Sequence, residues 1–180
     1  MDKFLNKYRI ASTRLQTGDY GSQASYFITI CTKNRKNYFG EIITAAETQN
    51  VASLQPTAIG LIAHNNWKEI PLHFPFVELD EFVVMPNHIH GILFFNPPWL
   101  HDWTTNKFGP QSQNLASVIR GYKASVKTFS TMNQIEFAWQ SRFHDRIIRS
   151  SKELSNTRQY IINNPANWHR DRNSLKPLPT

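Results

Sequence analysis

The sequence has little of what disulfide-bonded, zinc-binding or membrane-spanning proteins need. Among its 180 residues there is a single cysteine, Cys31, and no run approaches the length of about 18 apolar residues that spans a bilayer. One cysteine cannot form an internal disulfide or build a cysteine-rich zinc site. Residues 1–7 also lack the apolar stretch of a secretory signal. We therefore expect a protein of the reducing cytoplasm with no membrane partner.

Charged residues are also scarce, at 18%, whereas hydrophobic residues make up 40% of the chain and aromatic residues 13%. Such a composition excludes disorder as the default state. A chain of 180 residues is long enough to bury a substantial core. We expect one domain that spans residues 1–180.

The net charge of +7 is unevenly distributed along the chain. Residues 1–40 carry a net charge of +5, residues 41–106 carry −6, and residues 107–180 carry +8. Basic ends around an acidic middle would orient the protein against a polyanion such as a nucleic acid. The alternative is that the basic composition only aids solubility.

Apolar periodicity and turn residues predict the order strand, helix, strand, strand, helix, strand, helix. The predicted strands are residues 25–32, 76–84, 88–95 and 142–149, and the predicted helices are 56–71, 115–129 and one that starts after Ser150. Ser150 and Glu153 have the spacing of a capping box. This order is typical of an α+β ferredoxin-like βαββαβ sandwich, with helices on one face of an antiparallel sheet and an added C-terminal helix. Residues 1–22 are predicted to form an N-terminal arm and residues 96–113 a loop.

Two histidines lie on the third predicted strand. Residues two apart on a strand point to the same face, so His88 and His90 are expected to project together. Paired imidazoles are good ligands for a divalent metal if further ligands are available. The Pro86-Asn87 turn before the pair and Gly91 after it favour a functional site, because glycine allows another backbone or a ligand to approach. The alternative is one histidine in the core and one in solvent.

Tyr160 lies on the last predicted helix, and Asn164 follows four residues later on the same face. Leu154 and Ile161 form a core-facing stripe on that helix, which places Tyr160 at the edge of the packed face with its hydroxyl accessible. The alternative is an amphipathic tyrosine whose ring is buried and whose oxygen is hydrated.

A third cluster combines aromatic and basic residues over Trp139-Gln140 and residues 143–149. Arginines beside aromatic side chains suit phosphate contacts and base stacking. The alternative is an ordinary basic edge strand, whose charges discourage aggregation between sheets.

Together these segments resemble a known family, the single-tyrosine transposases with a histidine-hydrophobe-histidine (HUH) signature. The resemblance rests on Met85-Pro86-Asn87-His88-Ile89-His90-Gly91-Ile92, the basic helix from Leu115 to Lys123, the Trp-Gln and Phe-His-Asp block from Trp139 to Arg149, and Tyr160-Ile161-Ile162-Asn163-Asn164-Pro165. It spans residues 23–170, and the joint pattern is more specific than any one piece. The block at 139–149 is most similar to that of the branch of REP-associated tyrosine transposases. The segment 96–113 is longer than that family's pattern.

The resemblance implies a metal-dependent single-stranded DNA endonuclease and strand transferase. Tyr160 would attack the phosphorus to give a 5′-phosphotyrosine link, and His88, His90 and Asn164 would hold Mg²⁺ or Mn²⁺ against the scissile phosphate. The implied partner is single-stranded DNA with hairpin (REP-like) elements, bound by a monomer or a homodimer. The residues that would contact this DNA are Lys33, Arg35, Arg120, Lys123, Arg142, Arg146, Arg149 and Arg158.

Three other interpretations stay open at this stage. A replication initiator or relaxase would use related HUH chemistry, but these commonly show another motif order or a second tyrosine. A domesticated DNA-hairpin-binding protein would have lost its catalysis while keeping its surface. An RNA-binding ferredoxin-like domain would use strand aromatics such as Tyr26 and Phe27.

Overall fold

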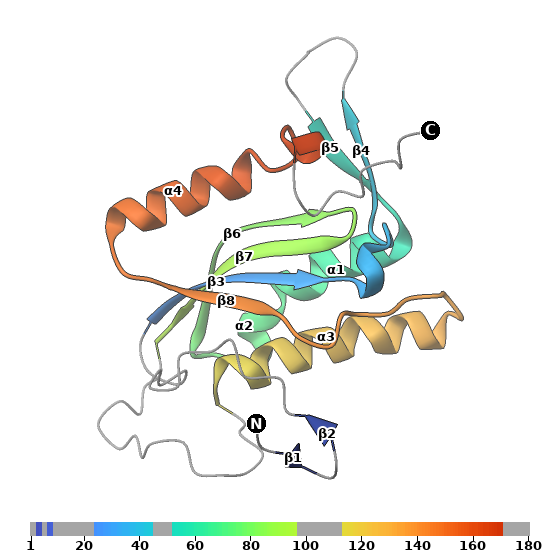
Figure 1. Ribbon diagram of the computed structural model, residues 1–180, viewed down its shortest axis with the longest axis horizontal. Coiled ribbons are helices and arrows are strands. Elements are labelled where there is room, and N and C mark those ends of the chain that lie inside the picture. The colour runs from blue at the N-terminus through green and yellow to red at the C-terminus, as the bar shows by residue number, and fades with distance from the viewer. Residues whose placement is uncertain (1–2, 5–6, 9–23, 45–51, 97–112, 171–180) are drawn as a thin grey trace.

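The computed structural model describes residues 3–4, 7–8, 24–44, 52–96 and 113–170 of the chain. Its centre is a four-stranded antiparallel sheet (Figure 1). The strands are β3 (Ala24–Cys31), β6 (Val77–Met85), β7 (His88–Phe95) and β8 (His144–Ile148), and they lie in the order β6-β7-β3-β8. The first of these strands along the chain, β3, therefore lies between the third, β7, and the fourth, β8. This is the βαββαβ ferredoxin-like arrangement predicted from the sequence.

One face of this sheet is covered by two long helices, α1 (Ala58–Lys68) and α3 (Leu115–Met132). Alternate residues of β3 point into this layer, among them Tyr26, Ile28 and Ile30, and all three are fully buried in the main core. The two helices also contact each other, and the Tyr122 hydroxyl of α3 donates to the Ala63 carbonyl of α1 at 2.8 Å. The core therefore lies between the sheet and this helix pair.

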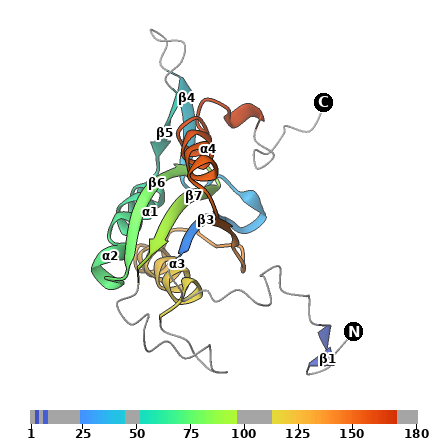
Figure 2. The same cartoon turned by 90° about the vertical axis from the view of Figure 1, so that its left-hand side faces the viewer.

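The opposite face of the sheet is covered by α4 (Ser151–Ile162), as Figures 1 and 2 show. A second, smaller apolar cluster forms there. Ile161 of α4 packs with Ile92 of β7 and Ile148 of β8, and Leu154 lies against them. The predicted core-facing stripe of Leu154 and Ile161 is thereby confirmed. Because β7 presents His88, His90 and Ile92 on this face, α4 lies over the strand that carries the two histidines.

The helix starts follow local capping rules. Thr57, the N-cap of α1, accepts a hydrogen bond from the Gly60 amide at 3.1 Å, and the helix starts two residues after the predicted Pro56. Helix α1 ends at Lys68, and a short helix, α2 (Ile70–His73), follows with Pro71 in its first turn. Ser150 accepts from the Glu153 amide at 3.2 Å as predicted.

The reciprocal half of the predicted capping box at α4 is displaced by one residue. The Glu153 carboxylate accepts from the Arg149 amide at 3.0 Å, one residue before the Ser150 amide that a capping box would use. The same carboxylate lies 3.3 Å from Nε of Arg146 on β8. It thus links the end of β8 to the start of α4. A complete capping box, formed by Asn114 and Ser117, begins α3, where the sequence had not been interpreted in this way.

A hairpin between β3 and α1 was missed from the sequence. It consists of β4 (Gly40–Thr44) and β5 (Ala52–Pro56), which pair antiparallel. Gly40 has φ +141°, and a Cβ there would collide with the Gln55 carbonyl oxygen. Only glycine fits this pairing, and the strands are too short to show a clear alternation of apolar residues.

Gly91 has a different role from the one predicted. A Cβ on Gly91 would collide with the ring of Trp67 from α1, so this glycine admits a core tryptophan to the helix-covered face of the sheet. The sequence predicted the approach of another backbone or a ligand, whereas the group that approaches Gly91 is the Trp67 side chain.

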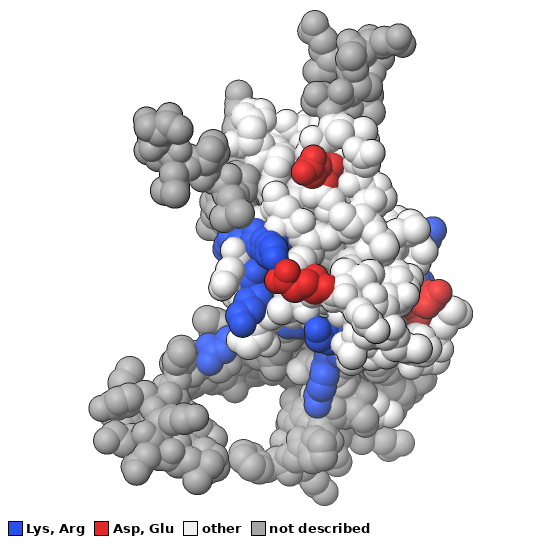
Figure 3. All heavy atoms as spheres, turned by 90° about the vertical axis from the view of Figure 1, so that its right-hand side faces the viewer, with Lys and Arg blue, Asp and Glu red and all other residues white. Residues whose placement is uncertain are grey.

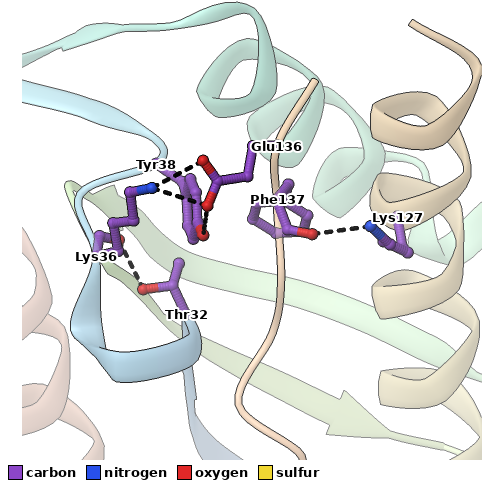
Figure 4. Close-up of polar contacts among 6 residues, drawn as sticks. All are labelled: Thr32, Lys36, Tyr38, Lys127, Glu136 and Phe137. Atoms are coloured by element: carbon purple, nitrogen blue, oxygen red, sulfur yellow. Dashed lines mark hydrogen bonds and ion pairs between the residues drawn. The ribbon is translucent and has the colours of Figure 1, made fainter. Parts of the chain in front are cut away.

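A short 3₁₀ turn, η1 (Lys33–Arg35), follows β3 and is fastened to the segment after α3 (Figure 4). The Lys33 amide donates to the Ala138 carbonyl at 2.8 Å, and the Lys36 ammonium lies 2.8 Å from the Glu136 carboxylate. The Tyr38 hydroxyl donates to the same carboxylate at 3.2 Å. These contacts hold η1 at one end of the sheet.

Two predicted segments lie largely outside the described residues. Of the arm at 1–22 only the paired two-residue strands β1 (Lys3–Phe4) and β2 (Lys7–Tyr8) are described, and of the loop at 96–113 only its two end residues. Within the described part of the chain, no helix has the length and apolar character to cross a membrane.

Candidate active site

The β6–β7 hairpin presents both histidines toward α4. His88 is fully buried and His90 is 2% exposed, and their ring centroids lie 4.4 Å apart at an interplanar angle of 68°. After the turn Pro86-Asn87, His88 pairs with Met85 of β6 on one side and with Cys31 of β3 on the other. The prediction that both imidazoles project together is confirmed.

Each imidazole is oriented by a hydrogen bond at Nδ1. His88 Nδ1 lies 3.0 Å from Oδ1 of Asn87, whose Nδ2 donates to the Arg35 carbonyl at 2.9 Å. Because that second bond directs the amide oxygen toward His88, Nδ1 of His88 is the donor and its lone pair is on Nε2. His90 Nδ1 lies 2.9 Å from the Thr29 hydroxyl of the neighbouring strand. Partners of this kind fix the orientation of metal-binding histidines.

The environment keeps His88 neutral. Burial lowers the pKa of His88 well below its ordinary value, and the neighbouring His90 and Arg35 lower it further. A neutral imidazole is the form that binds a metal ion.

Tyr160 reaches the histidine pair from α4. Its hydroxyl oxygen lies 3.3 Å from Nε2 of His90, and its ring centroid is 5.2 Å from the His90 ring. Phe27 of β3 packs edge-on against the Tyr160 ring at 6.0 Å. The side chain remains 46% exposed. It therefore combines a supported ring with a hydroxyl at the edge of the site, as the sequence had suggested.

Helix α4 is also held by an ion pair to the sheet. The Arg158 guanidinium lies 2.8 Å from the Asp80 carboxylate of β6, with Nε donating as well. Together with Ile161, this contact fixes both the position of α4 and its rotation about its own axis. Tyr160, two residues after Arg158, is placed accordingly.

Asn164 lies on the turn that follows α4. It is 3% exposed, its backbone N–H donates to the Ile161 carbonyl at 3.2 Å, and its side-chain Oδ1 is buried. The helix ends at Ile162, with Asn163 as its C-cap. Asn164 is therefore held rigidly one turn beyond Tyr160.

Side chains at this site could supply some of the ligands of a divalent metal ion, with water or phosphate supplying the others. Among the described residues, no cluster of three His, Cys, Asp or Glu side chains is present. Two imidazole nitrogens and one amide oxygen fit Mn²⁺ or Mg²⁺, because such ions accept oxygen ligands and leave positions for water or phosphate. The structure brings His88 and His90 together as two such ligands, whereas the part of Asn164 as a third ligand stays a prediction.

The predicted DNA-contacting residues are spread over several elements. Lys33 and Arg35 lie in η1, near the site, and Arg120 is exposed on α3, on the far side of the sheet. Figure 3 shows Lys and Arg side chains gathered on the side that lies at the right of Figure 1, with acidic side chains among them. The residues predicted to contact DNA therefore do not form one continuous basic surface.

Several of these basic side chains make contacts within the protein. Lys123 donates to the Gln140 carbonyl at 2.5 Å, and burial lowers its pKa. Arg142, Arg146 and Arg149 are all exposed, but Arg146 also lies over the Phe27 ring at 5.8 Å and beside Glu153. These contacts hold the segment after α3 and the end of β8 in place.

Four residues around the site were not assigned a role in this site from the sequence. Asn87 was interpreted only as a turn residue, and Thr29 is opposite His90 because of a strand register that the sequence does not display. Phe27 supports Tyr160, and Trp168 lies 6.0 Å from His88 between ring centroids. Only Asn87, adjacent to the histidine pair, carried a signal that could have been used.

The RNA-binding interpretation does not fit this arrangement. Tyr26 is fully buried beneath the helices, and Phe27 lies under Tyr160. Strand aromatics that stack on bases must be accessible on an open sheet face. Here α4 covers that face.

A solved structure shares this fold. The structure of a REP-associated tyrosine transposase bound to a REP hairpin superposes with a TM-score of 0.57 at 18% identity, covering 88% of this chain and 74% of that one. The chain therefore has the fold of the tyrosine transposases, as its sequence pattern implied. A putative transposase from Deinococcus radiodurans aligns over 87% of this chain and 97% of that one, with a TM-score of 0.40 at 13% identity.

The sequence comparison identifies a closer relative. An uncharacterized protein of Haemophilus influenzae is 36% identical over 169 residues, which cover 89% of this chain and 90% of that protein. The chain belongs to the family of this Haemophilus protein. No family profile matches the chain.

Proposed function

We propose that the chain is a metal-dependent endonuclease and strand transferase that cuts single-stranded DNA at hairpin-flanked sites through a 5′-phosphotyrosine intermediate. The observation that carries this proposal is the position of the Tyr160 hydroxyl, 3.3 Å from Nε2 of His90 in a buried histidine pair. A half-exposed phenol beside two oriented imidazoles has the nucleophile, the access and the supporting groups that phosphodiester cleavage needs.

The chemistry assigns one bond change to Tyr160. Its hydroxyl oxygen attacks the phosphorus, a bond from oxygen to phosphorus forms, and the bond from phosphorus to the 3′ oxygen breaks. The phenol proton leaves the tyrosine, and the departing 3′ oxygen takes up a proton to become a hydroxyl. Because one phosphodiester replaces another, a new 3′-hydroxyl can reverse the reaction and join strands without a nucleotide cofactor.

The chain's own residues position this chemistry. A phenol has a pKa near 10 in water and is a poor nucleophile at neutral pH, so the hydroxyl must be oriented and its proton accepted. His90 faces the hydroxyl through Nε2, and Phe27 and α4 restrict the ring. Bound Mg²⁺ or Mn²⁺, held by His88, His90 and Asn164, would supply a Lewis acid that polarises the phosphate.

The proposed partner is a DNA hairpin with an unpaired flank. The structural neighbour with this fold is bound to a REP hairpin, and the present chain carries a net charge of +7. Basic residues contribute the sequence-independent part of such binding, because they displace counterions from the phosphates.

The experiment is a covalent-capture assay. We would incubate the protein with labelled hairpins from DNA flanking its own gene, with Mn²⁺ or Mg²⁺, and resolve the products under denaturing conditions. The expected result is a protein–DNA adduct formed by the wild type and lost in Tyr160→Phe, which lacks only the attacking oxygen. Tyr38→Phe is the matched control, because the Tyr38 hydroxyl contacts Glu136 and not the histidines.

Other outcomes would contradict the proposal. An adduct that persists in Tyr160→Phe would assign the nucleophile elsewhere. Tight hairpin binding without any adduct in the wild type would favour the alternative of a domesticated hairpin-binding protein.

A further inference from the structure

The turn after β3 places an arginine beside the histidine pair. The Arg35 carbonyl accepts from Asn87 Nδ2 at 2.9 Å, and Oδ1 of the same Asn87 side chain lies 3.0 Å from His88 Nδ1. Asn87 is fully buried. One rigid side chain therefore ties the backbone of Arg35 to the ring of His88.

The backbone of this turn is held in an unfavourable conformation. Asn34 and Arg35 have consecutive positive φ angles, 55° and 53°. Asparagine tolerates this region, whereas arginine rarely occupies it. Such conformations persist where the surroundings determine them, and they concentrate at functional sites. Here the Arg35 amide donates to the Thr32 carbonyl at 3.2 Å, and the Lys33 amide to the Ala138 carbonyl at 2.8 Å.

The guanidinium of Arg35 is partly buried without an acceptor for one of its nitrogens: its Nη1 atom is buried and, among the residues that the structure describes, has no hydrogen-bond acceptor. A buried charged donor left in this state is costly. The charge also lies within electrostatic reach of His88, whose pKa it lowers. A cation beside a site that suits a divalent metal is unfavourable until an anion binds there as well.

We propose that Arg35 binds a non-bridging oxygen of the phosphate on which Tyr160 acts. This inference rests on the function proposed above and assigns a specific role to one of its basic residues. Arginine suits the role because its planar fork matches a phosphate with two donors. Two other arginines near α4 differ, since Arg158 is paired with Asp80 and Arg146 with Glu153.

The first test measures anion binding without cleavage. Inorganic phosphate is titrated into the metal-free protein while the NMR signal of the Asn87 side-chain amide reports on the site. We expect Arg35→Gln to weaken phosphate binding at this signal by about tenfold or more, the loss typical of a charge-assisted hydrogen bond. Lys68→Gln is the control, because Lys68 is exposed on α1 across the sheet and its loss removes the same unit of charge.

Equal phosphate affinity in the wild type and in folded Arg35→Gln would overturn the inference. If Arg35→Gln does not fold, Arg35→Lys carries the test, since it keeps the charge but loses the fork. The expected result is then a severalfold weaker affinity, and an unchanged affinity would overturn the inference in the same way.

A second readout uses the metal alone. Without an anion, removing the Arg35 charge is expected to tighten Mn²⁺ binding severalfold, whereas in the wild type added phosphate is expected to tighten it. Looser Mn²⁺ binding in Arg35→Gln would show that Arg35 only supports the structure of the histidine pair. Neither titration requires DNA cleavage, so failure of the adduct assay would reject the proposed function without deciding the role of Arg35.

Discussion

At the scale of single residues, the site depends on a buried amide that no sequence motif assigns a role. Asn87 accepts from His88 Nδ1 and donates to the Arg35 carbonyl. It thereby sets the tautomer of His88 and places its lone pair on Nε2. Supporting hydrogen bonds of this kind contribute strongly to metal affinity.

Asn87→Ala tests this role directly. We expect it to weaken Mn²⁺ binding by about 10- to 100-fold, because the imidazole loses the acceptor that fixes its tautomer. Isothermal titration calorimetry of the metal-free protein is the measurement. Asn65→Ala, at an exposed position on α1, is the control, and a change of less than twofold in Asn87→Ala would remove the assigned role.

The pKa of His88 predicts how stability depends on pH. Burial holds this pKa well below the ordinary value of 6.5. Between the two values the unfolded chain binds a proton that the folded protein does not, so stability falls as the pH falls below 6.5. The loss reaches at most about 1.4 kcal/mol per pH unit in that window.

Urea unfolding of the metal-free protein between pH 7 and pH 5 measures this effect. His88→Gln is expected to show a shallower decline of the unfolding free energy than the wild type. The exposed His64 of α1 gives the control variant His64→Gln. A decline of equal slope in His88→Gln and the wild type would contradict the assignment.

At the scale of elements, the sequence predicted the strands and helices that carry strong periodicity or capping signals. The strand at 88–95 and the helix start at Ser150 agree with β7 and α4. The β4–β5 hairpin escaped prediction because its pairing depends on the backbone of Gly40 rather than on apolar alternation. The face covered by α4 also could not be predicted, since it depends on packing between Ile161, Ile92 and Ile148, which are far apart in sequence.

The packing of α4 gives a prediction with a neighbouring control. Ile161 is 1% exposed against the sheet, whereas Ile162 is 52% exposed. Ile161→Ala is expected to lower the unfolding free energy by about 2–4 kcal/mol, and Ile162→Ala by less than about 1 kcal/mol. Urea denaturation measures both. Similar losses in the two variants would show that α4 is not held by this contact.

At the scale of the whole molecule, one chain brings Tyr160 and the two histidines together. Tyr160 lies against His90 of its own sheet, and β8 leads into α4 within a few residues. The sequence left open a monomer or a homodimer, and either state is compatible with a site built within one chain.

A complementation assay tests this arrangement. Mixing Tyr160→Phe with His90→Ala is expected to leave adduct formation absent, because no single chain then carries both groups. The readout is the denaturing gel described above, with each variant alone and the wild type as controls. Recovery of the adduct in the mixture would mean that α4 serves a partner's site.

The central claim is that Tyr160 forms the covalent link to DNA, and peptide mapping tests it most directly. After reaction with the hairpin and Mn²⁺, nuclease and trypsin digestion would leave a nucleotide on the peptide that carries the nucleophile. We expect this mass on residues 159–170, the tryptic peptide that follows Arg158 and contains Tyr160 as its only tyrosine. A nucleotide on any other peptide, with residues 159–170 unmodified, would contradict it.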